Sequence, residues 1–436
     1  MQSNKQMRLE QQTILRYMAL LCRRGAAGIV SDHKCRKRYL FLVLGITVVI
    51  ALIRPHFAMT AVQMLYDALY SLIWSVACFA AIPVCGYIPG SWRMYDDLTR
   101  AGIVNYAGEA PLLIDRQRLQ HSIEVLTFQI TGYPYENWDE NRTAIESALN
   151  VCILSLQQGK DNQTFALQVV PGNNAFQDTV LWQDDFLSEN PAVLVLGVNA
   201  AGIPVTIDFG KIPHWLLAAA TGYGKTQLLL LMLHQLYMHD WVIYLADYKS
   251  VDYPAEYQTD GYYATDNVQL LSMLDIVSAE LIRRRHLLSA SGCNHLDVYN
   301  STHVDKLLRI VVVLDETSMI LDATGRDKNE KSEVAAITGH LLTIGRLGRA
   351  MGIHLIIATQ RPDVASVPGA LKAQLDGRLC GHAADVQSAI VILDDGSGAK
   401  LPAIPGRFIV RDGTGDDKII QAYLYQTNQN QNTGKE

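Results

Sequence analysis

The chain has 436 residues, 49% of them hydrophobic, which is enough for a sizeable core and for two or three domains. Its formal net charge of −6 does not favour nucleic acid as a partner, although a binding stripe needs only a local cluster of Lys and Arg. The seven cysteines are scattered, odd in number and without the spacing of metal ligands, so they favour reduced thiols in a cytoplasmic or membrane setting over a disulfide framework.

Two uncharged apolar runs follow a polar-to-basic segment at residues 1–38. No small-residue cleavage pattern follows the first run, so it is not typical of a removable signal. Ala68–Ile88 is long enough, at about 1.5 Å per residue, to cross a hydrocarbon layer of roughly 30 Å. Tyr39–Ile53 is shorter, and it spans only if it extends past Arg54 with that side chain reaching the interface. Two buried core helices are the alternative, and a two-helix transmembrane hairpin over residues 39–90 is the prediction.

The distribution of basic residues predicts an orientation for this hairpin. Lys and Arg gather before the first run, whereas the connection from Arg54 to Asp67 carries one Arg and one His. The positive-inside bias keeps the N-terminus in the cytoplasm, and the hairpin returns the rest of the chain to the same side. The expected location is a cell membrane, crossed more than once, with both termini cytoplasmic.

Residues 91–190 are typical of a small α+β domain without a catalytic constellation. Strand-like segments lie at Val125–Thr131 and Phe165–Val170. Between them, Glu140–Leu156 has the spacing of an amphipathic helix. A β-hairpin is expected next, from Val193–Val198 and Pro204–Phe209.

A glycine-flanked loop after the next apolar run has the spacing of a phosphate-binding loop. It fits the pattern G-x-x-x-x-G-K-[ST], except that Ala219 stands at the first Gly. Gly222 and Gly224 can take backbone angles closed to other residues, so successive N–H groups can turn toward a phosphate beside the positive end of a helix. Lys225 would reach the outer phosphates of ATP, and the Thr226 hydroxyl would hold Mg²⁺. The candidate nucleotide-binding residues are Ala219, Ala220, Thr221, Gly222, Tyr223, Gly224, Lys225, Thr226 and Gln227.

Two later apolar runs end in carboxylates. Trp241–Ala246 ends at Asp247. Ile310–Leu314 ends at Asp315 and Glu316. Continuous apolar runs separated by helices predict strands covered on both faces, and hence a mostly parallel sheet that binds ligands at its carboxyl edge. Asp315 would hold Mg²⁺ through water, and Glu316 would orient and deprotonate the attacking water. A core strand ending in a surface turn is the alternative, and it explains the pair of carboxylates poorly.

The helix predicted over Val268–Leu288 carries the basic run Arg283–His286. This run either touches nucleic acid or forms a solvated helix end.

A third strand, Ile353–Ala358, delivers Gln360 to the same edge. A polar side chain at that place can sense the terminal phosphate. The helix before the strand ends with Arg346 and Arg349, and an arginine that reaches a neighbour's phosphates stabilises the charge of phosphoryl transfer. Ordinary surface arginines are the alternative. The predicted catalytic residues are Glu316, Arg349 and Gln360, and the predicted metal ligands are Thr226 and Asp315.

These segments together resemble the FtsK/SpoIIIE family of DNA-pumping ATPases. The resemblance rests on Ile212–Thr226, on Asp315-Glu316 and, most specifically, on Gly348–Pro362 with its Ala-Thr-Gln-Arg-Pro ending. It covers roughly residues 190–425, and Ile392–Gly396 and Pro405–Phe408 look like the family's C-terminal strands. The resemblance implies a RecA-like P-loop domain of mostly parallel sheet, a homohexamer, and ATP and Mg²⁺ used to move DNA.

Within that family, the layout looks like the membrane-anchored ATPases of conjugative plasmids and integrative elements of Gram-positive bacteria. That likeness implies coupling of DNA to a transfer channel, with a relaxase and channel proteins as partners. A chromosome-segregation translocase, a protein-secretion motor and an ATP-binding scaffold are the alternatives. The expected parts are a basic N-terminus at 1–38, the hairpin at 39–90, the α+β domain at 91–190, the ATPase domain at 191–426 and a disordered tail at 427–436.

Overall fold

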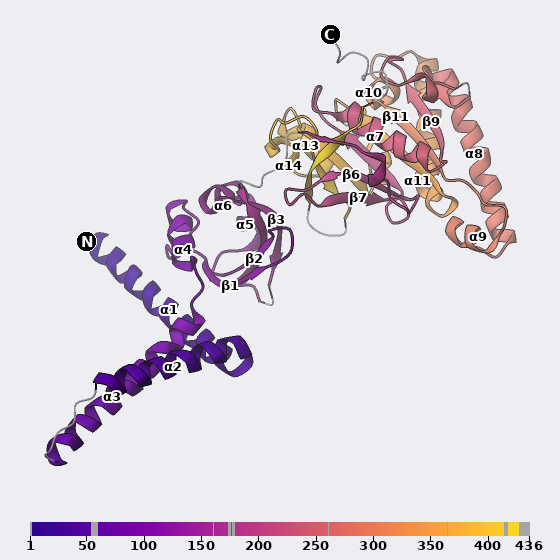
Figure 1. The fold of residues 1–436 in the computed structure, drawn as a ribbon. Helices are drawn as coiled ribbons and strands as arrows, with labels where there is room; N and C mark the ends of the chain where they lie inside the picture. The colour runs from indigo at the N-terminus through magenta and orange to yellow at the C-terminus, as the bar shows by residue number, and fades with distance from the viewer. Residues whose placement is uncertain are drawn as a thin grey trace, which may run out of the picture. The chain divides into compact units, whose positions relative to one another are not determined.

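The computed structural model divides the chain into two compact units, Met1–Asn173 and Asn174–Glu436 (Figure 1). It describes all residues except 1, 54–59, 160, 173–175, 177–178, 260, 364, 414–416 and 427–436. The tail predicted at residues 427–436 and Arg54 therefore lie outside the described residues. The division falls earlier than the expected boundary at 190/191, because the short strand β5 (Val180–Leu181) pairs with the last strand of the second unit.

The first unit begins with the helices α1 (Gln2–Ser31), α2 (His33–Ile53) and α3 (Thr60–Gly86). Antiparallel packing of α2 on α3 is fixed by a hydrogen bond of 2.9 Å from Trp74 Nε1 to Thr47 Oγ1. Within the described residues, one segment, Val62–Gly86, is long and apolar enough to cross a membrane, and it is mostly unburied. The predicted two-span hairpin is not confirmed, because four of the first six residues of α2 are basic and only Tyr39–Ile53 is left as an apolar run.

The rest of the first unit is a small α+β fold. Its antiparallel sheet has the strand order β1-β2-β4-β3, with α5 and α6 inserted between β2 and β3. Trp138 is 1% exposed and packs on Phe128 and Phe165, which lie on neighbouring strands. The elements are α4 (Ser91–Arg100), β1 (Leu112–Arg118), β2 (Glu124–Gln129), α5 (Tyr135–Glu140), α6 (Arg142–Leu149), β3 (Val151–Gln158) and β4 (Thr164–Pro171).

The single helix predicted over Glu140–Leu156 is wrong in its second half. The helix ends at Leu149, Asn150 takes the left-handed conformation with φ of 51°, and a strand follows. A register shift between Ile153 and Ser155 allows Ile153 and Leu156 to be buried together although they are three residues apart. This β-bulge therefore imitates the spacing of a helix in the sequence.

The second unit is built on an 11-stranded sheet with the order β10-β9-β11-β12-β8-β13-β14-β15-β6-β7 and β5 beside β15. The strands from β10 to β13 pair in parallel, and the pairs from β13–β14 to β6–β7 are antiparallel. The sheet is thus mixed: the predicted parallel part is present, and an antiparallel part extends it. The strands are β6 (Val193–Val198), β7 (Pro204–Asp208), β8 (His214–Ala218), β9 (Val242–Asp247), β10 (Tyr263–Ala264), β11 (Ile310–Asp315), β12 (Ile353–Thr359), β13 (Gly377–Gly381), β14 (Arg407–Arg411) and β15 (Lys418–Leu424).

Helices cover both faces of the parallel half. Val311 and Val313 of β11 join the cluster that contains Leu229 and Leu233 of α7, whereas Val312 faces the other cluster, formed with α8 and α11. The expected burial of these strands on both faces is confirmed. The helices are α7 (Lys225–Met238), α8 (Asn267–Ala290), α9 (Leu296–Thr302), α10 (Thr317–Leu321), α11 (Lys328–Met351), α12 (Gly369–Lys372), α13 (Val386–Leu393) and α14 (Ser397–Lys400), with 3-10 turns at Asp184–Phe186 and Ala255–Tyr257.

One of the strands expected near the C-terminus is a helix. Ile392 and Leu393 are the last two residues of α13. Asp385 caps the start of this helix by accepting the N–H of Ser388, and the helix ends at Asp394, which takes the left-handed conformation. The segment that leads into Phe408 does form a strand, β14.

Candidate functional site

The predicted phosphate loop connects the buried strand β8 to the start of α7. Gly222 and Gly224 have φ of 87° and 96°, which a residue with a side chain rarely adopts. A Cβ at Gly224 would also lie 3.0 Å from the backbone nitrogen of Gly406, whose N–H donates to the Tyr223 carbonyl at 3.1 Å. Both glycines are therefore required for the shape of the loop.

The loop surrounds a cavity of about 230 Å³. Ala219 does not line it, because it is 2% exposed and belongs to the core beneath the loop. Tyr223 also turns away, and its ring packs 4.7 Å from that of His382. The cavity is lined by Ala220, Thr221, Gly222, Gly224, Lys225, Thr226, Gln227 and Gln360.

Lys225 joins this cavity to the acidic end of β11. Its ammonium group forms an ion pair with Asp315, and the two side chains are 3% and 1% exposed. The second carboxylate oxygen of Asp315 is buried and has no hydrogen-bond partner among the described residues. Lys225 already balances the charge of Asp315, so the second oxygen is a position at which a further donor or a cation could bind.

Glu316 lies at the tip of β11 in a strained backbone conformation, with φ of 63°. Its carboxylate accepts hydrogen bonds from Ser318 Oγ at 2.7 Å and Thr359 Oγ1 at 3.0 Å. The backbone N–H of Gln360 also donates to it, at 3.0 Å. These donors hold the carboxylate against the end of β12.

Gln360 closes the connection between the strand ends. Its Oε1 accepts a hydrogen bond of 2.8 Å from the hydroxyl of Thr221 in the phosphate loop. The ends of β8, β11 and β12 thus meet at one edge of the sheet, where parallel strands deliver their carboxyl ends.

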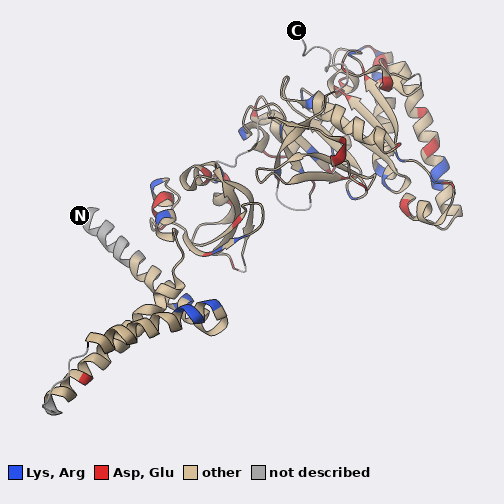
Figure 2. Ribbon diagram, in the orientation of Figure 1, with Lys and Arg blue, Asp and Glu red and all other residues tan. Residues whose placement is uncertain are grey.

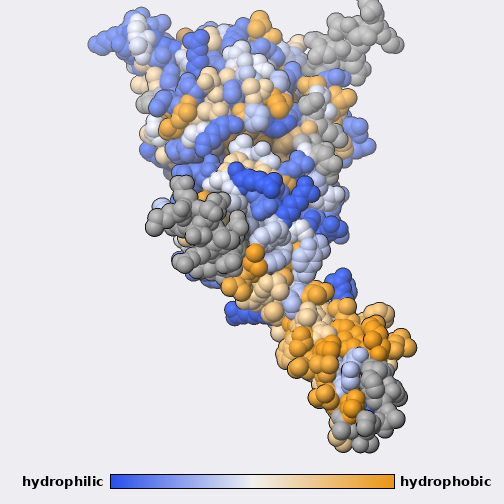
Figure 3. Space-filling view, turned by 90° about the vertical axis from the view of Figure 1, so that its left-hand side faces the viewer, coloured by the Kyte–Doolittle hydropathy of each residue, from blue (hydrophilic) through white to orange (hydrophobic). Residues whose placement is uncertain are grey.

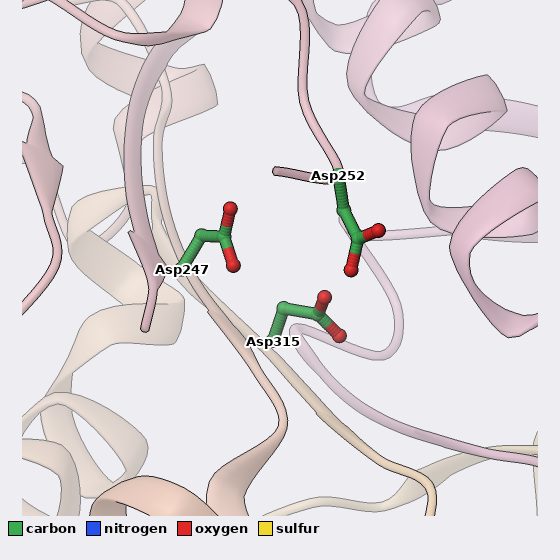
Figure 4. A group of neighbouring side chains, drawn as sticks. All are labelled: Asp247, Asp252 and Asp315. Carbon is green, nitrogen blue, oxygen red and sulfur yellow. The ribbon is translucent and has the colours of Figure 1, made fainter. Parts of the chain in front are cut away.

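Two carboxylates that the sequence analysis did not assign lie beside Asp315. Oxygens of Asp247, Asp252 and Asp315 are all within 4.8 Å of one another (Figure 4). Asp247 is opposite Asp315 in the parallel register of β9 and β11. The Asp at the end of each apolar run was the feature of the sequence that could have predicted this pair. Asp247 also accepts a hydrogen bond of 3.0 Å from the Tyr263 hydroxyl. Burial is the main cause, and this carboxylate the second, of a pKa of Tyr263 raised to about 12.

The hydroxyl of Tyr253 adds a buried polar group to this cluster. Tyr253 is 5% exposed, and within the described part of the chain its hydroxyl has no hydrogen-bond partner. Burial, and then the charge of Asp315, raise the pKa of Tyr253 well above its ordinary value. Lys249 lies 3.9 Å from Asp252 and 4.0 Å from Glu316, so it links the cluster to the predicted general base.

The residues at this edge fit Mg²⁺. Carboxylate and hydroxyl oxygens are the ligands that this ion prefers, and Asp315 offers an oxygen without a partner. Thr226 lines the neighbouring cavity. Lys225 lines the same cavity as Thr226 and pairs with Asp315, and Asp247 and Asp252 enlarge the set of oxygen donors near Asp315.

The two predicted arginines are not brought to this edge within one chain. Arg346 and Arg349 are exposed near the end of α11, which is followed by β12. The seven residues of β12 separate that point from Gln360, a span of about 20 Å at the rise of a strand. Neither arginine therefore lies at this site of its own chain.

The basic run in α8 has a structural explanation. Arg284 is 3% exposed and donates to Glu280, to the carbonyl of Met351 at 2.9 Å and to that of Leu308 at 2.8 Å. Arg283 pairs with Glu280 as well. Arg284 therefore belongs to the packing of α8, and Arg283, Arg285 and His286 are exposed, as expected of a solvated helix end.

A second cavity, of about 420 Å³ and mostly apolar, adjoins the phosphate loop and shares Gly224 and Gln227 with the first. Its other walls come from the start of α7, the segment before β14 and the strand β15. An apolar site next to phosphate-binding N–H groups suits a flat heterocycle. The remaining lining residues are Thr179, Leu228, Ile404, Pro405, Gly406, Gln421, Ala422, Tyr423 and Leu424.

Comparison with known proteins agrees with this geometry. Residues 179–364 match the FtsK/SpoIIIE family. The chain is 29% identical over 247 residues to DNA translocase SftA of Bacillus subtilis (strain 168), covering 54% of this chain and 25% of that protein. It is 28% identical over 222 residues to DNA translocase FtsK of Treponema pallidum (strain Nichols), covering 48% of this chain and 26% of that protein.

The chain thus spans about a quarter of the length of these relatives. Among solved structures, it resembles the pCW3 conjugation coupling protein TcpA in its monomer form with ATPγS. The identity is 28% and the TM-score 0.58, and the match covers 78% of this chain and 96% of that one.

Proposed function

Because the chain carries an ATPase domain of the FtsK/SpoIIIE family, we propose that it is a membrane-anchored motor that moves DNA during conjugative transfer of a mobile element. The observation that carries this proposal is the meeting of three strand ends, in which Thr221 bonds to Gln360 and Gln360 bonds to Glu316. The DNA translocases and the conjugation coupling protein among its relatives support DNA as the substrate and conjugation as the setting.

ATP would bind with its phosphates in the cavity around the loop. Backbone N–H groups of the loop and the first turn of α7 would donate to phosphate oxygens, and Lys225 would leave Asp315 for the outer phosphates. The base would lie in the apolar cavity between α7 and β15. Mg²⁺ would neutralise charge on the phosphates, with Thr226 and Asp315 as its expected ligands.

Glu316 would accept the proton of the attacking water. Its carboxylate is held by Thr359 and Gln360. When a terminal phosphate displaces Thr221 from the Gln360 side chain, the end of β12 becomes free to shift and to release the carboxylate. The same three residues would then report hydrolysis to the segment after β12, at residues 363–371, which we propose as a pore loop.

The site needs a second copy of the chain to be complete. Since Arg346 and Arg349 are exposed and about 20 Å from Gln360 along β12, they would serve a neighbour's nucleotide. A ring of six copies with DNA in its centre is the arrangement that we propose. A relaxase and channel proteins would be its partners in transfer.

Anchoring would come from the helices α2 and α3. Val62–Gly86 is long and apolar enough to span, and α2 packs against it in antiparallel fashion with no buried residues of its own. The basic start of α2 favours a cytoplasmic N-terminus and a cytoplasmic motor.

The decisive experiment measures ATP hydrolysis by the purified full-length protein with and without DNA at several salt concentrations. We expect DNA to raise the turnover, with an effect that weakens as salt rises because phosphate contacts dominate binding. A turnover that is indifferent to single- and double-stranded DNA at every salt concentration would refute the DNA part of the proposal.

A further inference from the structure

A basic cavity of about 520 Å³ lies in the first unit where α1, α2 and the end of α3 meet. It is far in sequence from the nucleotide site, and the proposed motor cycle does not use it. Its lining residues are Arg24, Gly28, Asp32, Lys34, Cys35, Arg38, Cys85 and Tyr87.

Close helix packing builds the walls of this cavity. A Cβ at Gly25 would clash with the carbonyl oxygen of Ile82, and a Cβ at Gly86 would clash with that of Leu21, so α1 and α3 touch backbone to backbone. A Cβ at Gly28 would lie 2.8 Å from Cys35 Sγ, which brings the start of α2 against α1. The cavity is therefore formed by close helix packing at Gly25, Gly28 and Gly86.

Positive charge dominates the lining. Lys34 and Arg38 are four residues apart and therefore share one face of α2, and within the described residues neither side chain forms an ion pair. Figure 2 shows basic residues, in blue, gathered where α2 begins. Arg24 also lines the cavity but already donates to Asp115, at 3.1 Å. The single carboxylate of the lining, Asp32, accepts the backbone N–H of Lys34 at 3.0 Å. With Arg24 paired to Asp115, the two unpaired cations Lys34 and Arg38 face one carboxylate, which favours an anionic ligand.

The surroundings of the cavity are apolar and exposed. Phe41 on α2 is 79% exposed, and Phe79 and Val84 on α3 are 73% and 59% exposed. Figure 3 shows the continuous hydrophobic surface over this end of the chain. Tyr87, 51% exposed, lies at the border, where tyrosine is typical of a membrane interface. A small inorganic anion would leave this apolar surface unused, whereas an amphiphile would cover it.

We propose that this cavity binds the phosphate headgroup of an anionic phospholipid, with Lys34 and Arg38 as its main contacts and the acyl chains along α2 and α3. The inference rests on the membrane anchoring proposed above. A basic pocket between helices at the cytoplasmic border of a membrane is a suitable site for such a headgroup. The motor would then sense, or prefer, membrane regions rich in anionic lipid.

The test is native mass spectrometry of the full-length protein in detergent, titrated with phosphatidylglycerol, phosphatidylcholine or inorganic phosphate. We expect phosphatidylglycerol to bind at least about tenfold more tightly than phosphatidylcholine. Each cation near a headgroup contributes about fivefold, so the double variant Lys34→Ala, Arg38→Ala should lose the preference almost completely. Lys37→Ala is the matched control, since Lys37 is exposed on the same helix but does not line the cavity.

Three outcomes would overturn the inference. Equal binding of both lipids by the unaltered protein is the first, and an equal loss in Lys37→Ala and the double variant is the second. The third is displacement of phosphatidylglycerol by an equal concentration of inorganic phosphate, which would indicate a site for free anions. Failure of the proposed function is distinguishable, because it would show as a protein absent from the membrane fraction or without ATP turnover in every variant.

Discussion

The hydroxyl of Thr221 donates to Oε1 of Gln360 at 2.8 Å, across 139 residues of sequence. Gln360 donates its backbone N–H to Glu316, so one residue touches both the phosphate loop and the predicted general base. A change at the terminal phosphate thus has a direct route to Glu316.

Removing the side-chain hydrogen bond between Thr221 and Gln360 should uncouple ATP binding from ATP hydrolysis. We expect Gln360→Ala and Thr221→Val to bind ATP with little change, and to lower turnover by about tenfold or more, because the position of the base would no longer depend on the phosphate. Binding of a fluorescent ATP analogue and steady-state turnover would be measured together. Thr302→Val is the control, since its hydroxyl bonds only within and beside α9. An equal loss of binding and turnover would contradict this role.

The buried pair of Lys225 and Asp315 should have separable effects on stability and activity. Lys225→Met should lower turnover by at least about 100-fold and should destabilise the nucleotide-free protein by about 3 kcal/mol, because it leaves Asp315 buried without its cation. The double variant Lys225→Met, Asp315→Asn should recover much of the stability and none of the activity. Thermal unfolding without nucleotide would show this, and a double variant less stable than Lys225→Met would refute the pairing argument.

The carboxylates of Asp247 and Asp252 should strengthen Mg²⁺ binding. Asp252→Asn should raise the Mg²⁺ concentration for half-maximal turnover several-fold, because one hard oxygen donor near Asp315 loses its charge. Affinity for ATP in the presence of a chelator should not change. Asp305→Asn, at an exposed position outside the cluster, is the control. An unchanged Mg²⁺ dependence in Asp252→Asn would limit the metal site to Asp315 and Thr226.

Arg349 should act on the nucleotide of a neighbouring copy. Arg349→Ala should fold normally, bind ATP and lose about 1,000-fold in turnover, the scale of an arginine supplied in trans. Mixing Arg349→Ala with Glu316→Gln should restore turnover above that of either variant alone, because mixed rings contain intact pairs. Arg346→Ala is the comparison that decides between the two arginines. No restoration in the mixture would place Arg349 outside the site.

Acid should destabilise the second unit through a buried histidine. Burial lowers the pKa of His214 from 6.5 to about 4. Between these two values the imidazole is protonated in the unfolded chain and neutral in the folded protein. This contribution to stability is complete above pH 6.5 and is lost as the pH falls toward 4, and it is worth on the order of 3 kcal/mol. His214→Asn can still accept the N–H of Leu355 and should reduce this dependence in denaturant titrations, while the buried His354, whose pKa burial also lowers, contributes the remainder. His286→Asn, on an exposed residue, should leave the dependence unchanged.

The sequence alone determined the local parts of the candidate site. The loop around Gly222 and Gly224, the acidic end of β11 and the position of Gln360 after β12 follow from apolar runs and turn residues that lie next to one another in the chain. Such patterns report which residues are buried and where a strand ends, because burial and turn formation depend on near neighbours.

The tertiary structure decided what depends on strand order and register. Asp247 joins Asp315 only because β9 pairs with β11 in that register, and the apolar cavity exists only because β15 returns beside α7. The spacing of apolar residues likewise does not predict the bulge at Ile153 or the distance of Arg349 from Gln360 of the same chain. Contacts between residues about a hundred positions apart are set by how whole elements pack, and no local pattern of side chains encodes that choice.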